Sequence, residues 1–363
     1  MRSSFSNLLS STVLAIALGT LPLQAAGTSS TDTADKKELT GELKQRKAAE
    51  DMLKRLGNTT SQLLTPSILV PPPMQGVASA ESGAPRSKAE LAYGAFQRGW
   101  YLTALDLATS AIENGEIPAA TLIGVLYETG SGVPLDTEKA AKWYETAASA
   151  GDSRASLRLG LMLLTGNGVK EDRHAAAEQF KLAAKDGIAE ALINLALLYQ
   201  EGEVLPRNMK KAADLLEQAA DQGDVSAMHS LGQLLLDEAE ETHDEMRGAF
   251  WLGRAARRGN VAAQVEYAIL LFQGEGVVPN QKEAADWFEK AAYSGNPVAM
   301  NRLARIYAYG RGRGQNIVLA AVWQHLANKQ GLFDSEIDDM TASLSLEQQE
   351  QVAEKVARLK SKL

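Results

Sequence analysis

A glycine recurs every 36 residues along most of this chain, and no other feature constrains its fold as strongly. The series is Gly115, Gly151, Gly187, Gly223, Gly259, Gly295 and Gly331. The same spacing governs an alanine series (Ala119, Ala155, Ala191, Ala227, Ala263, Ala299), an Asp/Asn series (Asp136, Asp172, Asn208, Asp244, Asn280, Asn316) and a second alanine series (Ala147, Ala183, Ala219, Ala255, Ala291, Ala327). Several independent series with one period cannot arise by chance, and a fixed period of this length indicates a stacked supersecondary unit.

The first copy predicts a pair of helices. Residues 119–127 carry apolar side chains at helical spacing, and the segment 130–134 contains the Gly and Pro that end such a helix. Asp136 stands where its carboxylate can accept hydrogen bonds from the free N–H groups of a second helix over 137–149. Gly151 then supplies the left-handed conformation that ends a helix at low cost. Asp152, Asp224, Asn260 and Asn296 follow the glycines as further capping residues.

Two kinds of column show how these helix pairs must pack. Small residues recur where helices approach closely: Gly124, Gly160, Ala196, Gly232, Ala268 and Ala304. A column of large residues contains Trp143, Gln179, Leu215, Trp251, Trp287 and Trp323, which we interpret as packing rather than as a sugar platform. A lone helix pair cannot bury such a face, whereas stacked pairs can. We therefore predict an all-α protein, a right-handed α-solenoid of tandem helix-turn-helix repeats.

The conserved spacing also resembles a known family. The first copy carries Tyr127, Gly130, Gly132, Val133, Asp136, Lys139, Ala140, Trp143, Tyr144, Ala147 and Ala148 before Gly151, and the fifth matches it nearly as well with Gly274, Gly276, Val277, Asn280, Ala284, Trp287, Phe288, Ala291, Ala292 and Gly295. This pattern resembles the Sel1-like repeats, relatives of the tetratricopeptide repeats, over residues 116–331. The resemblance implies an exported bacterial member that serves as a scaffold, adaptor or regulator, and it says almost nothing about catalytic activity.

Two copies depart from the pattern, and the flanks differ from it. The fourth copy has the acidic segment 237–242 in place of the Gly-x-Gly-Val loop, which predicts a longer helix. The sixth copy carries Arg311 and Arg313 in its loop. Residues 88–115 read as a shortened, tetratricopeptide-like first unit with a tight turn at 98–100. Residues 332–363 read as C-terminal capping helices.

The start of the chain has the pattern of a secretory signal peptide. Arg2 precedes a mostly apolar stretch over residues 8–23, and Ala25 or Ala26 fits a cleavage site. The alternative is an uncleaved anchor helix, although the apolar stretch is short for a span of ~20 residues. Residues 1–25 are therefore predicted to be a signal peptide, with no integral membrane span after its cleavage.

Composition indicates which segment is a linker and in which compartment the mature protein works. Residues 26–87 predict a flexible linker, in which residues 35–56 could form a short charged helix and residues 57–87 are rich in Ser, Thr, Gly and Pro. The chain contains no Cys, which excludes a disulfide framework and a thiolate metal site. Exported chains without Cys favour the bacterial periplasm.

Motifs for chemistry are sparse in this sequence. The net charge of −8 argues against a nucleic-acid partner. His174, His229, His243 and His325 have no spacing typical of metal ligands, and the Gly-x-Gly pairs recur as turns. The acidic run 237–245 is more typical of a solvated face on an extended helix than of a cation site. We predict no catalytic residue, no metal site and no cofactor.

Comparison of the copies indicates where a partner would bind. Two columns on the first helix vary: Leu122, Arg158, Asn194, Ser230, Glu266 and Arg302, then, one turn on, Val125, Leu161, Leu197, Gln233, Ile269 and Arg305. In related repeats the first helix lines a concave face, so these columns would form a groove with a basic C-terminal end. The alternative is that the second column is core and the first is ordinary surface. The candidate partner-binding residues are Arg158, Asn194, Ser230, Gln233, Glu266, Arg302 and Arg305.

The sequence is compatible with two functions. The first is a periplasmic scaffold, adaptor or regulator that binds a protein or peptide partner in the groove. The alternative is an envelope-associated hydrolase acting on cell wall or polysaccharide through an unrecognised site.

Overall fold

The computed structural model describes residues 87–360, and every regular element in that range is an α-helix. The predicted signal peptide and nearly all of the predicted linker lie outside the described residues. None of the helices within 87–360 combines the length and the apolar character that crossing a bilayer requires. The helices fall into two compact units, and the boundary between them along the chain falls within helix α11, between Leu231 and Gly232.

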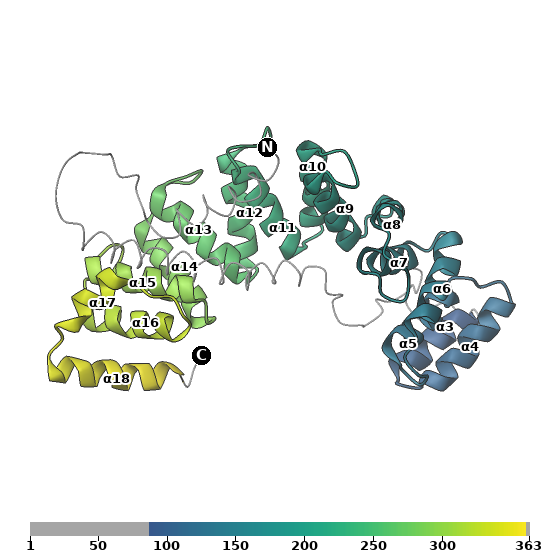
Figure 1. The fold of residues 1–363 in the computed structure, drawn as a ribbon, viewed down its shortest axis with the longest axis horizontal. Helices are drawn as coiled ribbons and strands as arrows, with labels where there is room; N and C mark the ends of the chain where they lie inside the picture. The colour runs from purple at the N-terminus through teal and green to yellow at the C-terminus, as the bar shows by residue number, and fades with distance from the viewer. Residues whose placement is uncertain (1–86, 361–363) are drawn as a thin grey trace, which may run out of the picture. The chain divides into compact units, whose positions relative to one another are not determined.

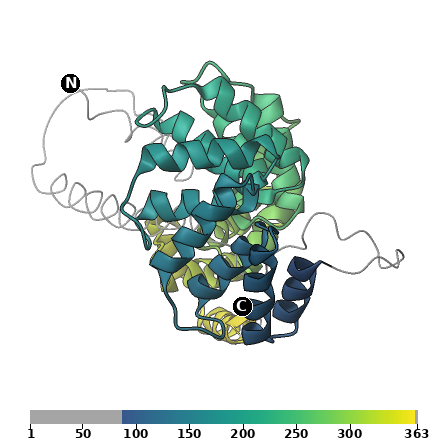
Figure 2. The same cartoon turned by 90° about the vertical axis from the view of Figure 1, so that its right-hand side faces the viewer.

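The first unit, residues 87–231, is a series of helices in which each helix from α3 to α9 packs on the next along the chain. The helices are α3 (Lys88–Gln97), α4 (Tyr101–Glu113), α5 (Ala119–Thr129), α6 (Thr137–Ser149), α7 (Ser153–Thr165), α8 (Arg173–Lys185), α9 (Ala189–Glu201), α10 (Met209–Asp221) and the first turns of α11 (Val225–Leu236). Both ribbon views show α3 and α4 paired beside α5 and α6 (Figures 1 and 2). The short turn at 98–100 separates α3 from α4, as predicted.

The second unit, residues 232–360, continues the same pairing and ends in two further helices (Figure 1). It contains the rest of α11, then α12 (Glu245–Arg257), α13 (Val261–Gln273), α14 (Gln281–Tyr293), α15 (Pro297–Tyr309), α16 (Ile317–Lys329), α17 (Ser335–Ala342) and α18 (Leu346–Lys360). Helix α16 contacts both α17 and α18. Ser345 and Gln348 form a capping box at the start of α18, with backbone-to-side-chain distances of 2.9 and 3.3 Å.

The predicted helix ends are confirmed in the first copy. The Lys139 backbone N–H donates to Asp136 Oδ1 at 2.9 Å, so Asp136 caps α6. Gly151 adopts a φ of 91°, the left-handed region that Gly enters at little cost. The Ala155 N–H then donates to Asp152 Oδ1 at 3.1 Å, which starts the next repeat. The tandem helix-turn-helix architecture follows from these repeated caps.

The column of small residues lies where the two helices of a repeat touch. A Cβ at Gly124 would stand 2.6 Å from Tyr144 Cε1, and one at Gly160 would stand 2.7 Å from Phe180 Cε1. Both rings are fully buried. Only hydrogen at these two positions lets the aromatic ring of the second helix rest on the backbone of the first.

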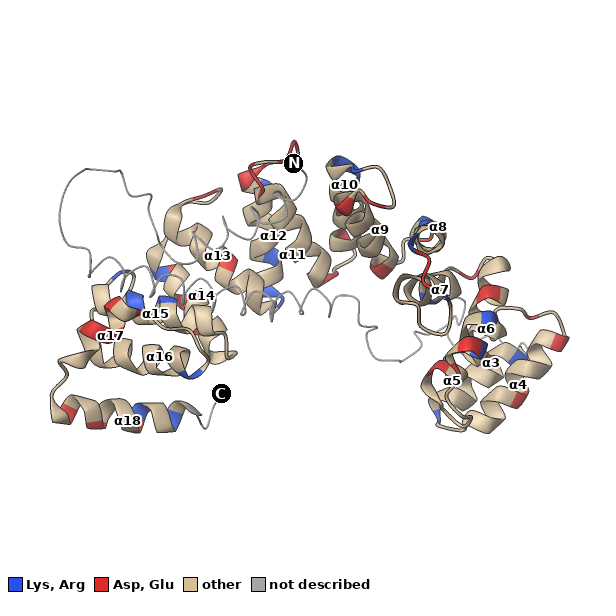
Figure 3. Ribbon diagram, in the orientation of Figure 1, with Lys and Arg blue, Asp and Glu red and all other residues tan. Residues whose placement is uncertain are grey.

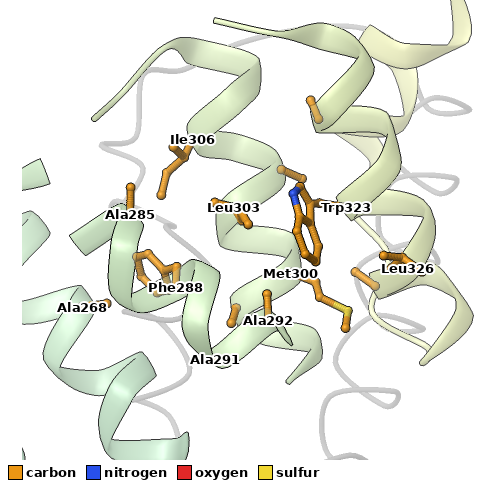
Figure 4. Close-up of a cluster of buried hydrophobic side chains, with 14 of the residues drawn as sticks. Ala268, Ala285, Phe288, Ala291, Ala292, Met300, Leu303, Ile306, Trp323 and Leu326 are labelled. Carbon is orange, nitrogen blue, oxygen red and sulfur yellow. The ribbon is translucent and has the colours of Figure 1, made fainter. Parts of the chain in front are cut away.

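Large apolar side chains fill the space between successive repeats. In the second unit Phe288 of α14 lies between Ala268 of α13 and Leu303 of α15 (Figure 4). Trp323 and Met300 belong to the same cluster, with exposed fractions of 3 % and 1 %. The burial of Trp323 agrees with the interpretation of the tryptophan column as packing.

The longer helix predicted for the fourth copy is wrong. Helix α11 ends at Leu236, and residues 237–242 form turns. The Ala239 N–H donates to Asp237 Oδ1 at 3.0 Å, and this local bond competes with continuation of the helix. Asp244 caps α12 by accepting from the Arg247 N–H at 3.0 Å, so the repeat restarts in register. The acidic run is therefore a loop, drawn in red in Figure 3, and not the face of an extended helix.

Candidate partner-binding site

Three candidate residues lie in the first unit, and the structure places them differently. Arg158 is half-buried on α7 and interacts electrostatically with Glu190 of α9. Burial raises the pKa of Glu190, the charge of Arg158 acts against that rise, and Asp224 adds to it. Asn194 is only 4 % exposed, and its Nδ2 donates to the Glu190 carbonyl at 2.7 Å. The Asn194 amide is thus engaged within the fold, while Ser230 of α11 is half-buried.

Two more candidates join neighbouring first helices of the second unit. Gln233 of α11 is exposed, and its Nε2 donates to Glu266 Oε1 of α13 at 2.8 Å. Glu266 itself is half-buried. This side-chain contact lies on the face predicted to meet a partner, and it leaves Gln233 accessible.

Arg302 and Arg305 meet at a pocket in the second unit with a volume of about 260 Å³. Helices α13, α14 and α15 build its walls, and the residue after the α15 C-cap completes them: Ile269, Phe272, Gln273, Phe288, Arg302, Arg305, Ile306, Tyr309 and Arg311. Phe288 and Ile306, which belong to the core cluster (Figure 4), also line the pocket. The predicted columns therefore contribute Ile269, Arg302 and Arg305 to one site.

Arg305 is held by acidic groups at the start of α17. Its Nε donates to Asp334 Oδ2 at 2.6 Å and its Nη2 to Asp334 Oδ1 at 2.9 Å, with Glu336 Oε2 at 3.1 Å from Nη1. Basic residues of α15 and acidic residues of α17 lie together in Figure 3. Burial alone would raise the pKa of Asp334, but hydrogen bonds from Arg305 and Asn301 outweigh burial and lower it. Arg305 is therefore partly a structural residue.

Arg302 occupies a drier position than Arg305. Burial, and then the neighbouring positive charge of Arg305, lower the pKa of Arg302 to about 10, and Asp334 acts against this shift. Arg302 still carries its charge at neutral pH. Arg311 is exposed, and its guanidinium lies 5.6 Å from the ring centroid of Tyr309. The pocket thus combines apolar walls with guanidinium groups that suit a carboxylate.

The structure adds residues that the sequence reasoning missed. Phe272 and Tyr309 line the pocket, and both stand in columns where other copies carry unrelated residues. Behind the arginines lies a buried polar cluster, in which Asn301 Nδ2 donates to Gln324 Oε1 at 3.0 Å and to Asp334 Oδ2 at 2.9 Å. The column of Gln324 otherwise holds large apolar residues: Tyr144, Phe180, Leu216, Leu252 and Phe288. The presence of Gln324 in this apolar column was the feature of the sequence that could have revealed the buried polar cluster.

Within residues 87–360, no three His, Asp or Glu side chains are grouped so that they could hold a metal ion. The residues that line the pocket include no carboxylate. The arrangement is one for binding an apolar group and an anion.

Comparisons with known proteins give the family. The Sel1 repeat model matches six consecutive segments, 117–152, 153–188, 189–224, 225–260, 261–296 and 297–332. A Sel1 repeat protein from Oxalobacter formigenes is 27 % identical with a TM-score of 0.57, over 67 % of this chain and 97 % of that one. A protective antigen of uropathogenic Escherichia coli is 28 % identical with a TM-score of 0.49, over 72 % of this chain and 64 % of that one. No curated protein matches the chain. Because the repeat model covers more than half of its residues, this chain belongs to the Sel1 repeat family.

Proposed function

We propose that this chain is an exported scaffold that holds a protein partner on the faces formed by the first helices of its repeats. Sel1 repeat proteins are generally protein-interaction scaffolds. The observation that carries the proposal is the contrast between two sets of positions. Core positions such as Ala155 and Ala299 repeat from copy to copy, whereas Arg158, Ser230 and Arg302 share one column and differ in chemistry. Positions that packing does not fix are those that can be adapted to a partner.

No feature of residues 87–360 favours the hydrolase alternative. The pocket in the second unit supports the scaffold because its lining suits recognition of a side chain. Arg302 is half-buried there beside Phe272 and Ile269. A charged group in a partly apolar recess gives specificity when a complementary group replaces its lost hydration.

Photo-cross-linking in cells tests where a partner binds. A photoreactive amino acid is placed at Arg158 or at Gln233 on first helices, and at exposed Lys142 or Gln218 on second helices as matched controls. We expect a protein adduct from the first-helix positions and a much weaker one from the controls. Equal adducts from both sets, or adducts from the second helices alone, would contradict the proposal.

The periplasmic location is also part of the proposal, supported by the charged start, apolar stretch and small-residue site of residues 1–25. The full chain is expressed in a bacterium, and the periplasmic fraction is collected by osmotic shock. We expect a mature protein whose first residue is Ala26 or Gly27 by N-terminal sequencing. Retention of the full-length precursor in the cytoplasm would refute export, and a full-length chain in the membrane fraction would indicate an anchor.

A further inference from the structure

We propose that the outer face of α12 binds a partner helix that carries apolar residues on one side and basic residues beside them. Met246 and Phe250 of α12 form this face together with Val278, which lies in the loop before α14. The face belongs to the second helix of the fourth repeat. It therefore goes beyond the proposed function, which places a partner on the first helices, and its test does not depend on that proposal.

Three large apolar side chains are exposed together at this face. Met246, Phe250 and Val278 have exposed fractions of 74 %, 52 % and 84 %. Met246 and Phe250 stand four residues apart, so they lie on one side of α12. The loop that carries Val278 packs on the start of α12, because a Cβ at Gly276 would stand 3.1 Å from the Met246 nitrogen. Single exposed apolar residues are ordinary, whereas a group of them marks a site of interaction.

The other repeats show that the fold does not require apolar residues at these positions. The column of Phe250 holds charged residues in the neighbouring copies, and the column of Met246 holds polar or charged ones: Lys142, Glu178, Asp214 and Asp286, then Glu138, His174, Lys210 and Lys282. All of these side chains are exposed. The apolar residues of α12 therefore serve something other than the packing of the repeat.

The sixth repeat shows what covers these positions when they are apolar. There Val318 and Val322 occupy the same two columns, with exposed fractions of 8 % and 0 %. Helix α16, which carries them, contacts α18 (Figure 1), and Val356 of α18 belongs to the same core cluster as Val322. An amphipathic helix thus covers this face in the last repeat. The face of α12 offers the same two positions to a helix, and it stays exposed within residues 87–360.

Negative charge beside the face determines the charge of its partner. Burial, and then the charges of Glu245 and Glu238, raise the pKa of Glu275 in the loop after α13. Both charges that shift this pKa are negative, so the three carboxylates repel one another. The imidazole Nε2 of His243 lies 3.8 Å from Glu245. A Lys or Arg from a partner would relieve the repulsion, and the net charge of −8 of the whole chain also attracts a basic segment.

Positive groups on α12 are already engaged within the fold. The Arg254 guanidinium lies over the rings of Phe250 and Trp251, at 5.7 and 4.7 Å from their centroids. Arg247 and Arg254 also have further interactions among the described residues. Arg254 stands one turn after Phe250, whereas Glu245 begins the helix. The basic residues of the partner helix therefore belong over the first turn of α12.

Fluorescence anisotropy with labelled peptides and the full chain tests the inference. The basic probe has the sequence of residues 346–360, because α18 covers the equivalent face, with its glutamates changed: Glu347→Lys, Glu350→Lys and Glu354→Lys. An acidic control keeps the glutamates and changes the basic residues: Lys355→Glu, Arg358→Glu and Lys360→Glu. A polar control is the basic probe with its apolar side removed: Val352→Ser, Val356→Ser and Leu359→Ser.

Variants of the protein locate the binding surface. Phe250→Ser and Met246→Ser, made separately, remove apolar side chains of the face. Phe333→Ser is their matched control, because Phe333 is 62 % exposed on the same unit and lies outside α12. Glu275→Gln removes one of the carboxylates, with exposed Asp339→Asn as its control. Circular dichroism confirms that each variant retains its helices, and Met246→Ser keeps the test valid if Phe250→Ser disturbs the packing of α12.

We expect the basic probe to bind at least about tenfold more tightly than either control peptide, because only this probe matches both the apolar face and its charge. Phe250→Ser and Met246→Ser should each weaken that binding about tenfold, since each removes apolar contact area. Glu275→Gln should weaken it roughly threefold, because an ion pair near the surface contributes little. Phe333→Ser and Asp339→Asn should leave it unchanged.

Three results with the peptides would overturn the inference: equal binding of all three, no binding of the basic probe, or binding that neither Phe250→Ser nor Met246→Ser weakens. Self-association of the chain that Phe250→Ser abolishes, measured by analytical ultracentrifugation, would also overturn it, because a second copy would then cover the face. The cross-link at Gln233 tests a first helix, so none of these results changes what it says about the proposed function.

Discussion

Asp334 joins the last repeat to the helices that follow it, and replacing it by Asn should loosen that end of the protein. Its two oxygens accept from Arg305 Nε at 2.6 Å, Arg305 Nη2 at 2.9 Å and Asn301 Nδ2 at 2.9 Å. It also caps α17 by accepting from the Ile337 N–H at 3.4 Å. Asp334→Asn keeps the size of the side chain. It removes the charge. It also replaces one accepting oxygen by an NH₂ group, which can only donate and would face the donor groups of Arg305 and Asn301.

The expected loss of stability depends on how deeply Asp334 is buried and on which partner Arg305 keeps. Asp334 is 8 % exposed, and breaking a buried ion pair by changing one partner costs ~3–5 kcal/mol. The Arg305 side chain is 29 % exposed and keeps Glu336 at 3.1 Å, so part of its lost interaction is recovered. We therefore expect a loss of roughly 2–3 kcal/mol in local stability. Glu336→Gln is the matched control, because that exposed pair is worth at most ~1 kcal/mol.

Hydrogen exchange by mass spectrometry, with urea unfolding followed by circular dichroism, measures the effect. Stability in repeat proteins is a sum of local terms, so protection should fall mainly in α15–α18. The folded state lowers the pKa of Asp334 below its usual 3.8. Its stabilisation is therefore present above that value and lost as the pH falls through the lower folded pKa, where variant and wild type should converge. Protection within about 0.5 kcal/mol of the control at neutral pH would refute the reasoning.

Two further substitutions test the packing. Gly124→Ala should destabilise by ~1–3 kcal/mol because its Cβ would stand 2.6 Å from the buried ring of Tyr144, whereas Gly94→Ala, with no atom closer than 4.0 Å, should gain up to ~1 kcal/mol of helix propensity. Urea midpoints that move in the same direction would contradict this. Trp323→Ala should cost ~3–5 kcal/mol because the ring is 3 % exposed, and Trp100→Ala, at 57 %, should change the thermal midpoint little. Comparable losses would show that the tryptophan column does not carry the packing.

The sequence predicted the repeat because its signals are local and are copied six times. Asp136 sits before a helix, Gly151 sits after it, and each acts through backbone groups a few residues away. Such signals need no knowledge of the tertiary structure. Their periodic recurrence also separated turns such as the one at Gly130 from phosphate-binding loops.

The same local reasoning failed at residues 237–242. Glu and Ala favour a helix, and the pattern of the other loops is missing there. The prediction ignored that the side chain of Asp237 can bond to the Ala239 N–H, and that Asp244 must start α12 in register. Helix propensity differs by only tenths of a kcal/mol between such residues. The requirement that α12 begin at the same position of the repeat as the other second helices outweighs this small preference.

The candidate site could be predicted only as a face of the helices. Column comparison placed Arg302 and Arg305 on that face, and it also selected Asn194, whose amide is turned into its own helix. It could not reveal that Arg305 is held by Asp334, because Asp334 lies beyond the last repeat. Pairing with a non-repeated segment leaves no periodic signal.

The buried polar cluster distinguishes the sixth repeat from the earlier ones. Earlier copies place a large apolar residue such as Phe288 where the sixth has Gln324. Gln324 is 1 % exposed, accepts from Asn301 at 3.0 Å and donates to Asn328 Oδ1 at 2.7 Å. Buried polar groups require such partners, and each one left unsatisfied costs ~1–3 kcal/mol. An apolar seventh repeat would leave Asn301 without Asp334. The polar groups of the last repeat are therefore matched to Asp334 at the start of α17.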